Sequence, residues 1–256
     1  MASAPVSRAA PFRREGQHFA IDLPGATAVF TTRRGGHSTG PYASLNLGRL
    51  TDDDPEAVQA NLRTVRDEFG VRLMWGRQVH GTEVVLHTEA DGGPPAEPEP
   101  SPREGDGRIT TVRGLAPMVL TADCLAVIVA GEGGAGALHA GWRGLAGGVL
   151  GAGVARLRAE GVDGELQAAI GPHARVCCYE VGEEVHEAFA AGGYGDARSG
   201  RHLDMTRIAE GQLRAAGVSR VHDLGLCTMC ADPGLFYSHR REHGVTGRQA
   251  GLAWLN

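Results

Sequence analysis

The sequence predicts a single domain in which a mixed β-sheet is combined with helices. Segments with strand-like and helix-like patterns alternate irregularly along the 256 residues, which is not the order of a doubly wound parallel sheet. The GxGxxG fingerprint of dinucleotide-binding folds is missing where a first strand would meet a helix. Hydrophobic residues make up 42% of the chain, so a chain of this length can bury a sizeable core.

The clearest helix of the first half is expected over residues 54–69. Its apolar residues recur at helical spacing after Asp54-Pro55, a pair that is typical of a helix start. Further helices are expected at 145–160, at 181–191 and near 204–216. Strands are expected at 18–22, 26–33, 71–79, 83–88, 116–121, 125–130, 137–140 and 166–170, with short strands near 221–226, 235–238 and 250–255.

Two segments are expected to lie outside the packed core. Residues 1–16 are interpreted as a flexible N-terminal arm. Residues 91–107, with the sequence DGGPPAEPEPSPREGDG, are rich in Pro, Glu and Gly and are predicted to form an exposed loop. Residues 17–256 are therefore predicted to form one catalytic domain.

Composition and charge restrict the function classes. The net charge of −5 argues against a general nucleic-acid-binding protein, which usually carries a basic excess. The N-terminal residues lack the apolar core of a signal peptide, and no apolar run is long enough to span a membrane. The five cysteines are an odd number and do not suggest a disulfide framework. We therefore expect a cytoplasmic protein with reduced thiols and no membrane partner.

Three segments each place a metal-binding side chain at the expected end of a strand, beside small or turn-forming residues. They contain His80 in QVHG, Cys124 in TADC and His139 in HAGWRG. Two imidazoles and one thiolate suit zinc, and catalytic zinc keeps three protein ligands with an open position for water or substrate. Histidines that only form surface hydrogen bonds and an inert buried cysteine are the alternative.

A second group of thiols comprises Cys177, Cys178, Cys227 and Cys230. The last two have CxxC spacing, and with the first two they could form a four-thiolate structural zinc site. Adjacent cysteines do not easily both bind one tetrahedral ion, however, and buried free thiols are the alternative.

Polar residues beside turn-forming backbone are candidates for binding substrate. Arg33 in TTRRGG and Arg240 in SHRR could bind phosphate, because a guanidinium group donates two parallel hydrogen bonds to an oxyanion. Asn46 in SLNLG is a turn residue or a substrate contact. Asp123 is next to Cys124 in an expected strand, so its side chain should point to the opposite face unless the strand bulges. It could therefore support the site without touching the metal.

Together these segments resemble one family, long known as multicopper polyphenol oxidase or laccase-domain proteins. That family is now associated with zinc-dependent purine nucleoside phosphorylase and adenosine deaminase activity, and its bacterial members are also named peptidoglycan editing factor. The resemblance rests above all on RQVHGTEV (77–84), LTADCLAVIVA (120–130) and GALHAGWRGLAGGVL (136–150) in that order. It continues in TTRRGGHSTGPYASLNLG (31–48), AAIGP (168–172), CCYEVGEEV (177–185) and FYSHRREHGVTGRQAGLAWL (236–255).

The resemblance implies an α+β fold of mixed β-sheets sandwiched by helices. It implies that His80, Cys124 and His139 bind the catalytic metal, zinc or alternatively copper. It also implies that phosphate cleaves adenosine, inosine, guanosine and S-methyl-5'-thioadenosine to the free base and (thio)ribose 1-phosphate, with adenosine deaminated at the same site. Members often have a cysteine after the Gly-Pro of AAIGP, where this chain has His173, which could contact the substrate or the metal or face solvent.

Three other functions stay open on the sequence alone. The first is a copper-dependent polyphenol oxidase, although no HxH pair of the true laccases occurs here. The second is a hydrolase that edits peptidoglycan precursors, with Cys124 as nucleophile and His139 as base. The third is a binding module without activity. No heptad or exposed apolar stripe is visible, which favours a monomer whose partners are purine nucleosides and phosphate.

Overall fold

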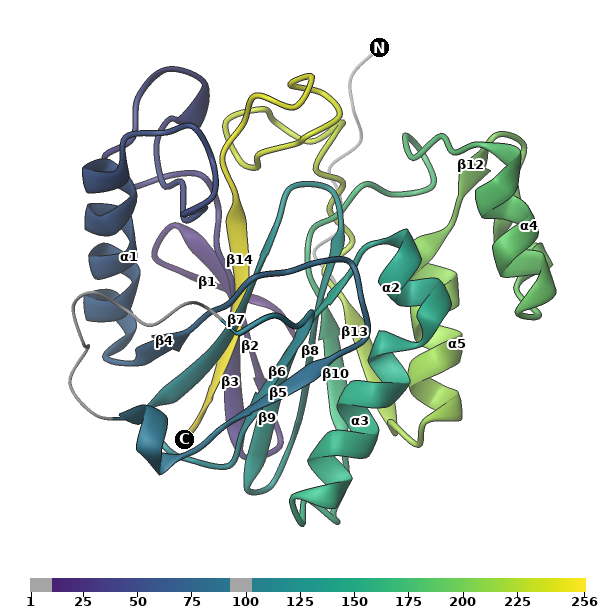
Figure 1. The fold of residues 1–256 in the computed structure, drawn as a ribbon, viewed down its shortest axis with the longest axis horizontal. Coiled ribbons are helices and arrows are strands. Elements are labelled where there is room, and N and C mark those ends of the chain that lie inside the picture. Colours follow the sequence, from purple (N-terminus) through teal and green to yellow (C-terminus); the bar gives the residue numbers. More distant parts are fainter. Residues whose placement is uncertain (1–10, 93–102) are drawn as a thin grey trace.

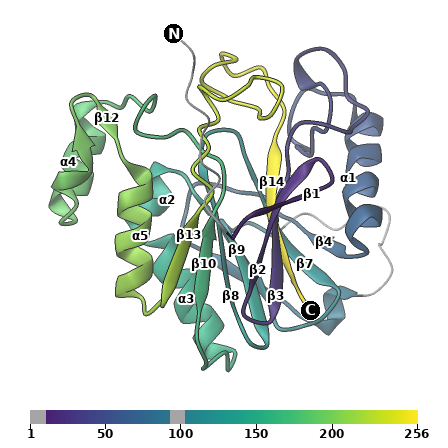
Figure 2. The ribbon, with the colours of Figure 1, turned by 180° about the vertical axis from the view of Figure 1, so that it is seen from behind.

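The computed structural model describes residues 11–92 and 103–256, which form two six-stranded sheets packed face to face between helices (Figures 1 and 2). The first sheet has the order β1 (Arg13–Glu15), β2 (His18–Leu23), β3 (Ala26–Phe30), β14 (Gln249–Leu255), β7 (Leu115–Thr121), β4 (Arg72–Met74). The second has the order β13 (Arg220–Asp223), β10 (Gln167–Ile170), β8 (Leu125–Gly131), β9 (Gly134–Ala140), β6 (Gly107–Thr110), β5 (Val84–His87). A small hairpin pairs β11 (Arg198–Ser199) with β12 (His202–Leu203).

Both sheets are mixed. The β4–β7, β5–β6 and β10–β13 pairs are parallel, whereas the pairs formed by β8, β9 and β14 with their other neighbours are antiparallel. The prediction of an α+β fold with mixed sheets sandwiched by helices is confirmed.

Helices cover the outer face of each sheet. Helix α1 (Pro55–Phe69) lies on the first sheet, on the left in Figure 1, and buries one apolar stripe against it. Asp54 caps this helix by accepting a hydrogen bond from the Glu56 backbone N–H, so the expected start is confirmed. The second sheet packs against α2 (Trp142–Gly147), α3 (Val149–Ala159) and α5 (Met205–Ala215), with α4 (Glu183–Ala191) beside them.

Small side chains fill the layer between the two sheets. Eight alanines are buried there, among larger residues such as Ile21, Phe30 and Ile128. Because alanine methyl groups occupy little space, the two sheets can pack closely against each other. The loops at the upper ends of the two sheets in Figure 1 therefore lie near one another.

Several expected boundaries are corrected. The helix predicted at 145–160 is two helices, because Gly148 has a left-handed φ of 89° that interrupts it. The strand predicted at 235–238 is not formed. Instead the Tyr237 backbone N–H and C=O bond to the side-chain amide of Gln249, so they do not join a β-ladder.

Both segments expected outside the core are ordered at their C-terminal ends. Within the arm predicted at 1–16, residues 1–10 lie outside the described residues, but Arg13–Glu15 forms β1, and Arg13 pairs with Asp22 at 2.9 Å. Within the loop predicted at 91–107, residues 93–102 lie outside the described residues. Asp106 is fully buried and Gly107 begins β6, because β6 pairs with β9 inside the second sheet.

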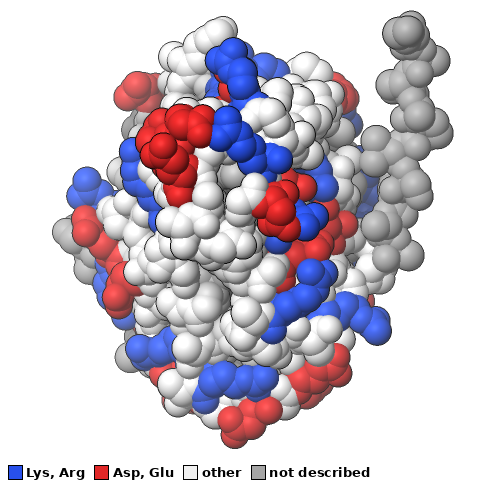
Figure 3. Space-filling model, turned by 90° about the vertical axis from the view of Figure 1, so that its right-hand side faces the viewer, with Lys and Arg blue, Asp and Glu red and all other residues white. Residues whose placement is uncertain are grey.

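The described surface carries charges of both signs. On the side of the molecule seen in Figure 3, arginines and acidic residues are interleaved around large uncharged areas. Among the described residues, no helix is both long and apolar enough to cross a membrane.

Candidate metal centre and active site

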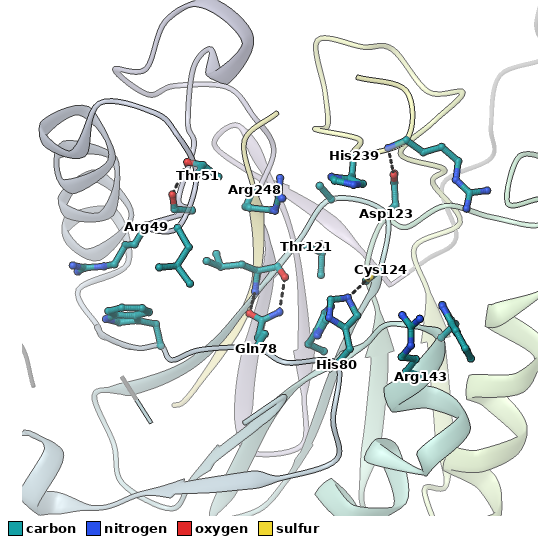
Figure 4. Close-up of a pocket in the computed structure, with 18 of the residues that line it drawn as sticks. Arg49, Thr51, Gln78, His80, Thr121, Asp123, Cys124, Arg143, His239 and Arg248 are labelled. Atoms are coloured by element: carbon teal, nitrogen blue, oxygen red, sulfur yellow. Dashed lines mark hydrogen bonds between the residues drawn. The ribbon is translucent and has the colours of Figure 1, made fainter. Parts of the chain in front are cut away.

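His80, Cys124 and His139 converge at the ends of three different segments. His80 lies in the loop between β4 and β5, Cys124 immediately precedes β8, and His139 is on β9. The β8–β9 pairing sets Leu125 opposite Ala140 and so brings Cys124 next to His139. Their potential ligand atoms all lie within 4.8 Å of one another, and Cys124 Sγ is 3.8 Å from His80 Nε2 (Figure 4).

A buried carboxylate orients two of these three side chains. The Asp106 side chain accepts hydrogen bonds from the backbone N–H groups of Val79, His80 and Gly81 at 3.0, 2.9 and 2.8 Å. It also accepts one from His139 Nδ1 at 2.7 Å, which leaves Nε2 of His139 for a metal ion. Asp106 thus fixes both the turn that carries His80 and the orientation of the His139 ring.

Two residues of the site hold unusual backbone angles. His80 has a φ of 59° and Asp123 a φ of 99°, in the region that favours glycine. At Asp123 this angle breaks strand alternation, so Asp123 and Cys124 line the same cavity. The Asp123 carboxylate accepts hydrogen bonds from the Thr228 hydroxyl at 2.6 Å and the Arg240 backbone N–H at 2.8 Å, and these contacts stabilise the turn.

Gly141 leaves the space in which the three donors meet. A Cβ atom at this position would lie 2.5 Å from His80 Cδ2 and 3.2 Å from Cys124 Sγ. Only glycine therefore lets the HAGWRG turn approach both donors without displacing them.

Cys124 and His139 shift each other's titration. Burial alone would raise the pKa of the Cys124 thiol, but the charge of His139 outweighs it and lowers the pKa to about 6. Burial alone would lower the pKa of His139, but Cys124 and Asp106 raise it to about 9. At neutral pH the cysteine is accordingly a thiolate, the form that binds metal ions.

The donor set fits a metal ion. Two imidazole nitrogens and one thiolate sulfur approach one point, His139 is held by a carboxylate in the manner of zinc-bound histidines, and one side of the group faces the cavity.

The cavity above these donors has a volume of about 400 Å³ and is strongly basic. Among the described residues, its lining contains four arginines and one acidic residue, Asp123. The arginines are Arg49, Arg143, Arg240 and Arg248. Trp75, Trp142 and Tyr179 add aromatic surface, so the cavity suits an anion joined to a flat apolar group.

Among the residues selected from the sequence as substrate contacts, the structure places Asp123 and Arg240 in this lining. The Arg240 guanidinium lies 4.9 Å from the centre of the Tyr179 ring and donates to the Glu180 carbonyl. Asn46 is fully buried behind the lining, where its side-chain oxygen accepts from the backbone N–H groups of Gly48 and Arg248. Asn46 therefore positions two residues of the lining.

Arg33 and His173 lie elsewhere. Arg33 pairs with Glu242 at 2.7 Å and donates to the Ala43 carbonyl at 2.7 Å, so it fastens the early loop to the C-terminal one. His173 is fully buried, donates from Nδ1 to the Gly171 carbonyl and accepts at Nε2 from the Thr206 hydroxyl, both at 2.9 Å. Neither residue is part of the described cavity lining.

Several residues of the site were not selected from the sequence. Asp106 stood inside the segment expected to be an exposed loop, and only the pairing of β6 with β9 buries it. Gln78 forms two 2.8 Å hydrogen bonds to the backbone of Leu120, and thus joins the His80 loop to the strand that precedes Cys124. The sequence could have indicated Gln78 as part of the site, because it stands two residues before His80 in the same QVHG motif.

Comparisons with known proteins identify the family of this chain. A family model described as "Multi-copper polyphenol oxidoreductase laccase" matches residues 27–256. This chain belongs to that family. A relative from Pseudomonas aeruginosa, named purine nucleoside phosphorylase, is 42% identical over 245 residues, covering 89% of this chain and 93% of the relative. Another from Xylella fastidiosa, with the same name, is 39% identical over 249 residues, covering 91% and 93%.

Solved structures of the family share the fold. YlmD from Geobacillus stearothermophilus has a TM-score of 0.84 at 31% identity, over 96% of this chain and 98% of that one. The Bacillus licheniformis protein YfiH has a TM-score of 0.89 at 28% identity, over 96% and 100%. The expected family membership is confirmed, and with the clustered donors it indicates a metal-dependent enzyme.

Proposed function

We propose that this protein is a metal-dependent purine nucleoside phosphorylase. Its substrates would be adenosine, inosine, guanosine and S-methyl-5'-thioadenosine, which phosphate cleaves to the free base and (thio)ribose 1-phosphate. The observation that carries the proposal is the convergence of His80, Cys124 and His139 on a basic, aromatic-lined cavity, in a chain whose relatives are named purine nucleoside phosphorylase.

The excess of arginines supports binding of phosphate. Four guanidinium groups face one carboxylate in the lining, and both Asp123 oxygens already accept hydrogen bonds from Thr228 and Arg240. Within residues 11–92 and 103–256, Arg143, which Figure 4 labels, forms neither a hydrogen bond nor an ion pair. Its guanidinium carbon lies over the Trp142 ring, 4.4 Å from the ring centre. Arg143 is therefore the first candidate for binding phosphate, with Arg240 and Arg248 beside the cavity as its partners.

Aromatic surface supports binding of the purine. A purine offers a flat face with polar edges, and the Trp75, Trp142 and Tyr179 rings in the lining can stack on such a face. A cavity of about 400 Å³ is also of the size usual for small-molecule sites.

His80, Cys124 and His139 would hold the metal ion, which we propose to be zinc. Zinc is borderline-soft and accepts imidazole nitrogen and thiolate sulfur together. A zinc ion there would supply a Lewis acid with an open coordination position for a substrate oxygen or a water molecule.

The chain's own residues would place and stabilise the reactants. In phosphorolysis a phosphate oxygen bonds to C1' of the ribose while the bond from C1' to the purine nitrogen breaks, and its electron pair leaves with the base. The arginines would hold the phosphate near C1' and neutralise its charge, and the aromatic side chains would hold the base in line for departure. The Arg240 backbone N–H donates to the Asp123 carboxylate, so this hydrogen bond would keep the turn that carries Arg240 at a fixed distance from the turn that carries Cys124.

The test is release of hypoxanthine from inosine, measured with and without phosphate, for wild type and for Cys124→Ala. We expect the variant to lose phosphate-dependent cleavage and also to lose the metal ion at the active site, which elemental analysis would show as a lower metal content than in wild type. Gly151→Ala serves as the control, since Gly151 lies in α3 outside the cavity lining and a new Cβ there meets nothing within 4 Å. Unchanged cleavage by Cys124→Ala would contradict the proposal.

Adenosine deamination is a second proposed activity of the same cavity. Water would add to C6 of the purine and ammonia would leave, a reaction that zinc deaminases perform with a different set of histidine and cysteine ligands and a glutamate that transfers the protons. Formation of inosine from adenosine in the absence of phosphate is the assay, and Cys124→Ala should abolish it too.

The low pKa of Cys124 keeps the Cys-His hydrolase as an alternative. A thiolate beside a protonated imidazole is also the arrangement of a nucleophile and its acid–base partner. A thiol-directed covalent probe distinguishes the two functions. Labelling of Cys124 in the metal-loaded protein would favour the hydrolase, and protection by metal would favour the phosphorylase.

A further inference from the structure

A second cluster of thiols lies outside the active-site cavity. The Sγ atoms of Cys177, Cys178, Cys227 and Cys230 are all within 4.8 Å of one another, and those of Cys177 and Cys230 are 3.5 Å apart. The first two follow β10 and the last two follow β13, so the cluster joins the ends of two parallel neighbouring strands.

Backbone contacts fix the two pairs of thiols relative to each other. The chain makes a tight turn at Arg175, whose carbonyl accepts hydrogen bonds from the N–H groups of Cys178 and Tyr179, both at 2.8 Å. The N–H of Thr228 donates to the His173 carbonyl at 3.0 Å and ties the CxxC segment to the chain that leads into this turn. The turn is what lets two adjacent cysteines face the same point, which an extended chain would not allow.

We propose that Cys177, Cys178, Cys227 and Cys230 bind a structural zinc ion, separate from the ion at the active site. Zinc–sulfur bonds are about 2.3 Å long, so the sulfurs of a tetrahedral four-thiolate site lie about 3.8 Å apart. The distances in the cluster bracket this value, and such a site needs only small side-chain movements to close. Four thiolates and no open position are the donor set of structural zinc rather than catalytic zinc.

The position of the cluster gives the ion a consequence for the active site. Tyr179, which lines the cavity, follows Cys178 directly in the chain. Thr228, which lies between the two cysteines of the CxxC segment, donates its hydroxyl hydrogen bond to Asp123 beside Cys124. A zinc ion at the four cysteines would therefore hold one wall of the cavity and the turn that carries Cys124.

The test counts metal ions per chain by native mass spectrometry after reconstitution with zinc under reducing conditions. We expect about two zinc ions in wild type, about one in Cys124→Ala and about one in the double variant Cys177→Ser/Cys230→Ser. The double variant changes the two exposed thiols of the cluster, so serine side chains can remain solvated there. Absence of zinc from Cys124→Ala would overturn the proposal.

A spectroscopic measurement on Cys124→Ala keeps the proposal falsifiable if the double variant does not fold. Cobalt bound to this variant should show the tetrahedral absorption and the intense sulfur-to-cobalt charge transfer of several thiolate ligands. A spectrum without sulfur ligands would refute a four-cysteine site.

The competing structure is a Cys177–Cys230 disulfide, which the 3.5 Å separation also permits. Intact-mass analysis after alkylation in denaturant decides between them. All five thiols of zinc-loaded wild type should react once the metal is removed, whereas two unreactive cysteines that become reactive only after reduction would contradict the zinc site.

Discussion

Replacing Asp106 by asparagine should weaken metal binding even though His80, Cys124 and His139 themselves are unchanged. Each carboxylate oxygen accepts two hydrogen bonds: Oδ1 from His80 N and His139 Nδ1, and Oδ2 from the N–H groups of Val79 and Gly81. An amide has the same shape but turns one acceptor into a donor. Two N–H groups then meet an NH₂ group in a site that is closed to water.

The cost follows from the number of hydrogen bonds lost. A buried donor left without a partner costs about 1–3 kcal/mol, so Asp106→Asn should lower the free energy of unfolding by roughly 2–6 kcal/mol. The His139 ring also loses its charged acceptor, and loss of such a group typically weakens metal affinity or activity about 10- to 100-fold. We expect both effects together, because one carboxylate holds both His80 and His139.

Zinc affinity is measured by competition with a chromophoric chelator below the melting temperature of the variant, and stability by urea unfolding. Asp163→Asn is the control, since Asp163 is exposed and forms no side-chain hydrogen bond with any described residue. The reasoning is refuted if Asp106→Asn binds zinc as tightly as the control. A loss of stability without a change in affinity would show that Asp106 supports the fold but does not orient His139.

Three further predictions test the glycine, the arginine and the buried histidine. Gly141→Ala should displace His80 and abolish tight metal binding, whereas Gly151→Ala in α3, where a new Cβ meets nothing within 4 Å, should bind metal normally and unfold at the same or a slightly higher temperature. Arg143→Ala should raise KM for phosphate roughly 10-fold or more in steady-state phosphorolysis, because a hydrogen bond between charged groups is lost; equal KM values in wild type and variant would contradict this. Burial lowers the pKa of His173 from 6.5 to about 4, so below pH 6.5 the unfolded chain takes up a proton that the folded chain does not, and stability should fall by on the order of 3 kcal/mol between pH 6.5 and 4. His173→Asn should flatten this dependence in urea unfolding at each pH, and an unchanged slope would show that other groups cause it.

Local patterns were sufficient where local interactions determine the structure. Helix α1 was predicted within a residue because its capping residue, its apolar stripe and its C-terminal glycine all lie inside or beside the helix. The sequence also predicted that His80, Cys124 and His139 lie together, because each stands in a short motif beside glycine or a turn, and their donor atoms do converge. What the sequence did not give was their common partner, Asp106.

Long-range pairing determined the remaining features. Arg33 stood beside turn-forming glycines and was expected to bind phosphate, yet its side chain pairs with Glu242, 209 residues away in the chain. Asp106 stands inside the segment predicted to be an exposed loop, yet the pairing of β6 with β9 buries it. Adjacent cysteines do not easily both bind one tetrahedral ion, but the turn at Arg175, which depends on contacts outside the CC pair, brings the sulfurs of Cys177 and Cys178 into one cluster.

The contact between Thr228 and Asp123 links the four-cysteine cluster to the active site, and Thr228→Val tests that link. Valine has nearly the shape of threonine but cannot donate to Asp123 Oδ1, so a buried carboxylate loses its 2.6 Å hydrogen bond, at a cost of about 1–3 kcal/mol. A left-handed φ such as the 99° of Asp123 itself costs on the order of 1–3 kcal/mol, so without this contact the turn should relax and displace Cys124. We therefore expect Thr228→Val to release metal from the His80, Cys124 and His139 centre more readily, while the cysteine cluster keeps its own ion. Thr228→Ser retains the hydroxyl and should behave as wild type in the same chelator competition. If serine and valine at this position release metal equally, the hydroxyl does not hold the turn, and the two sites are independent.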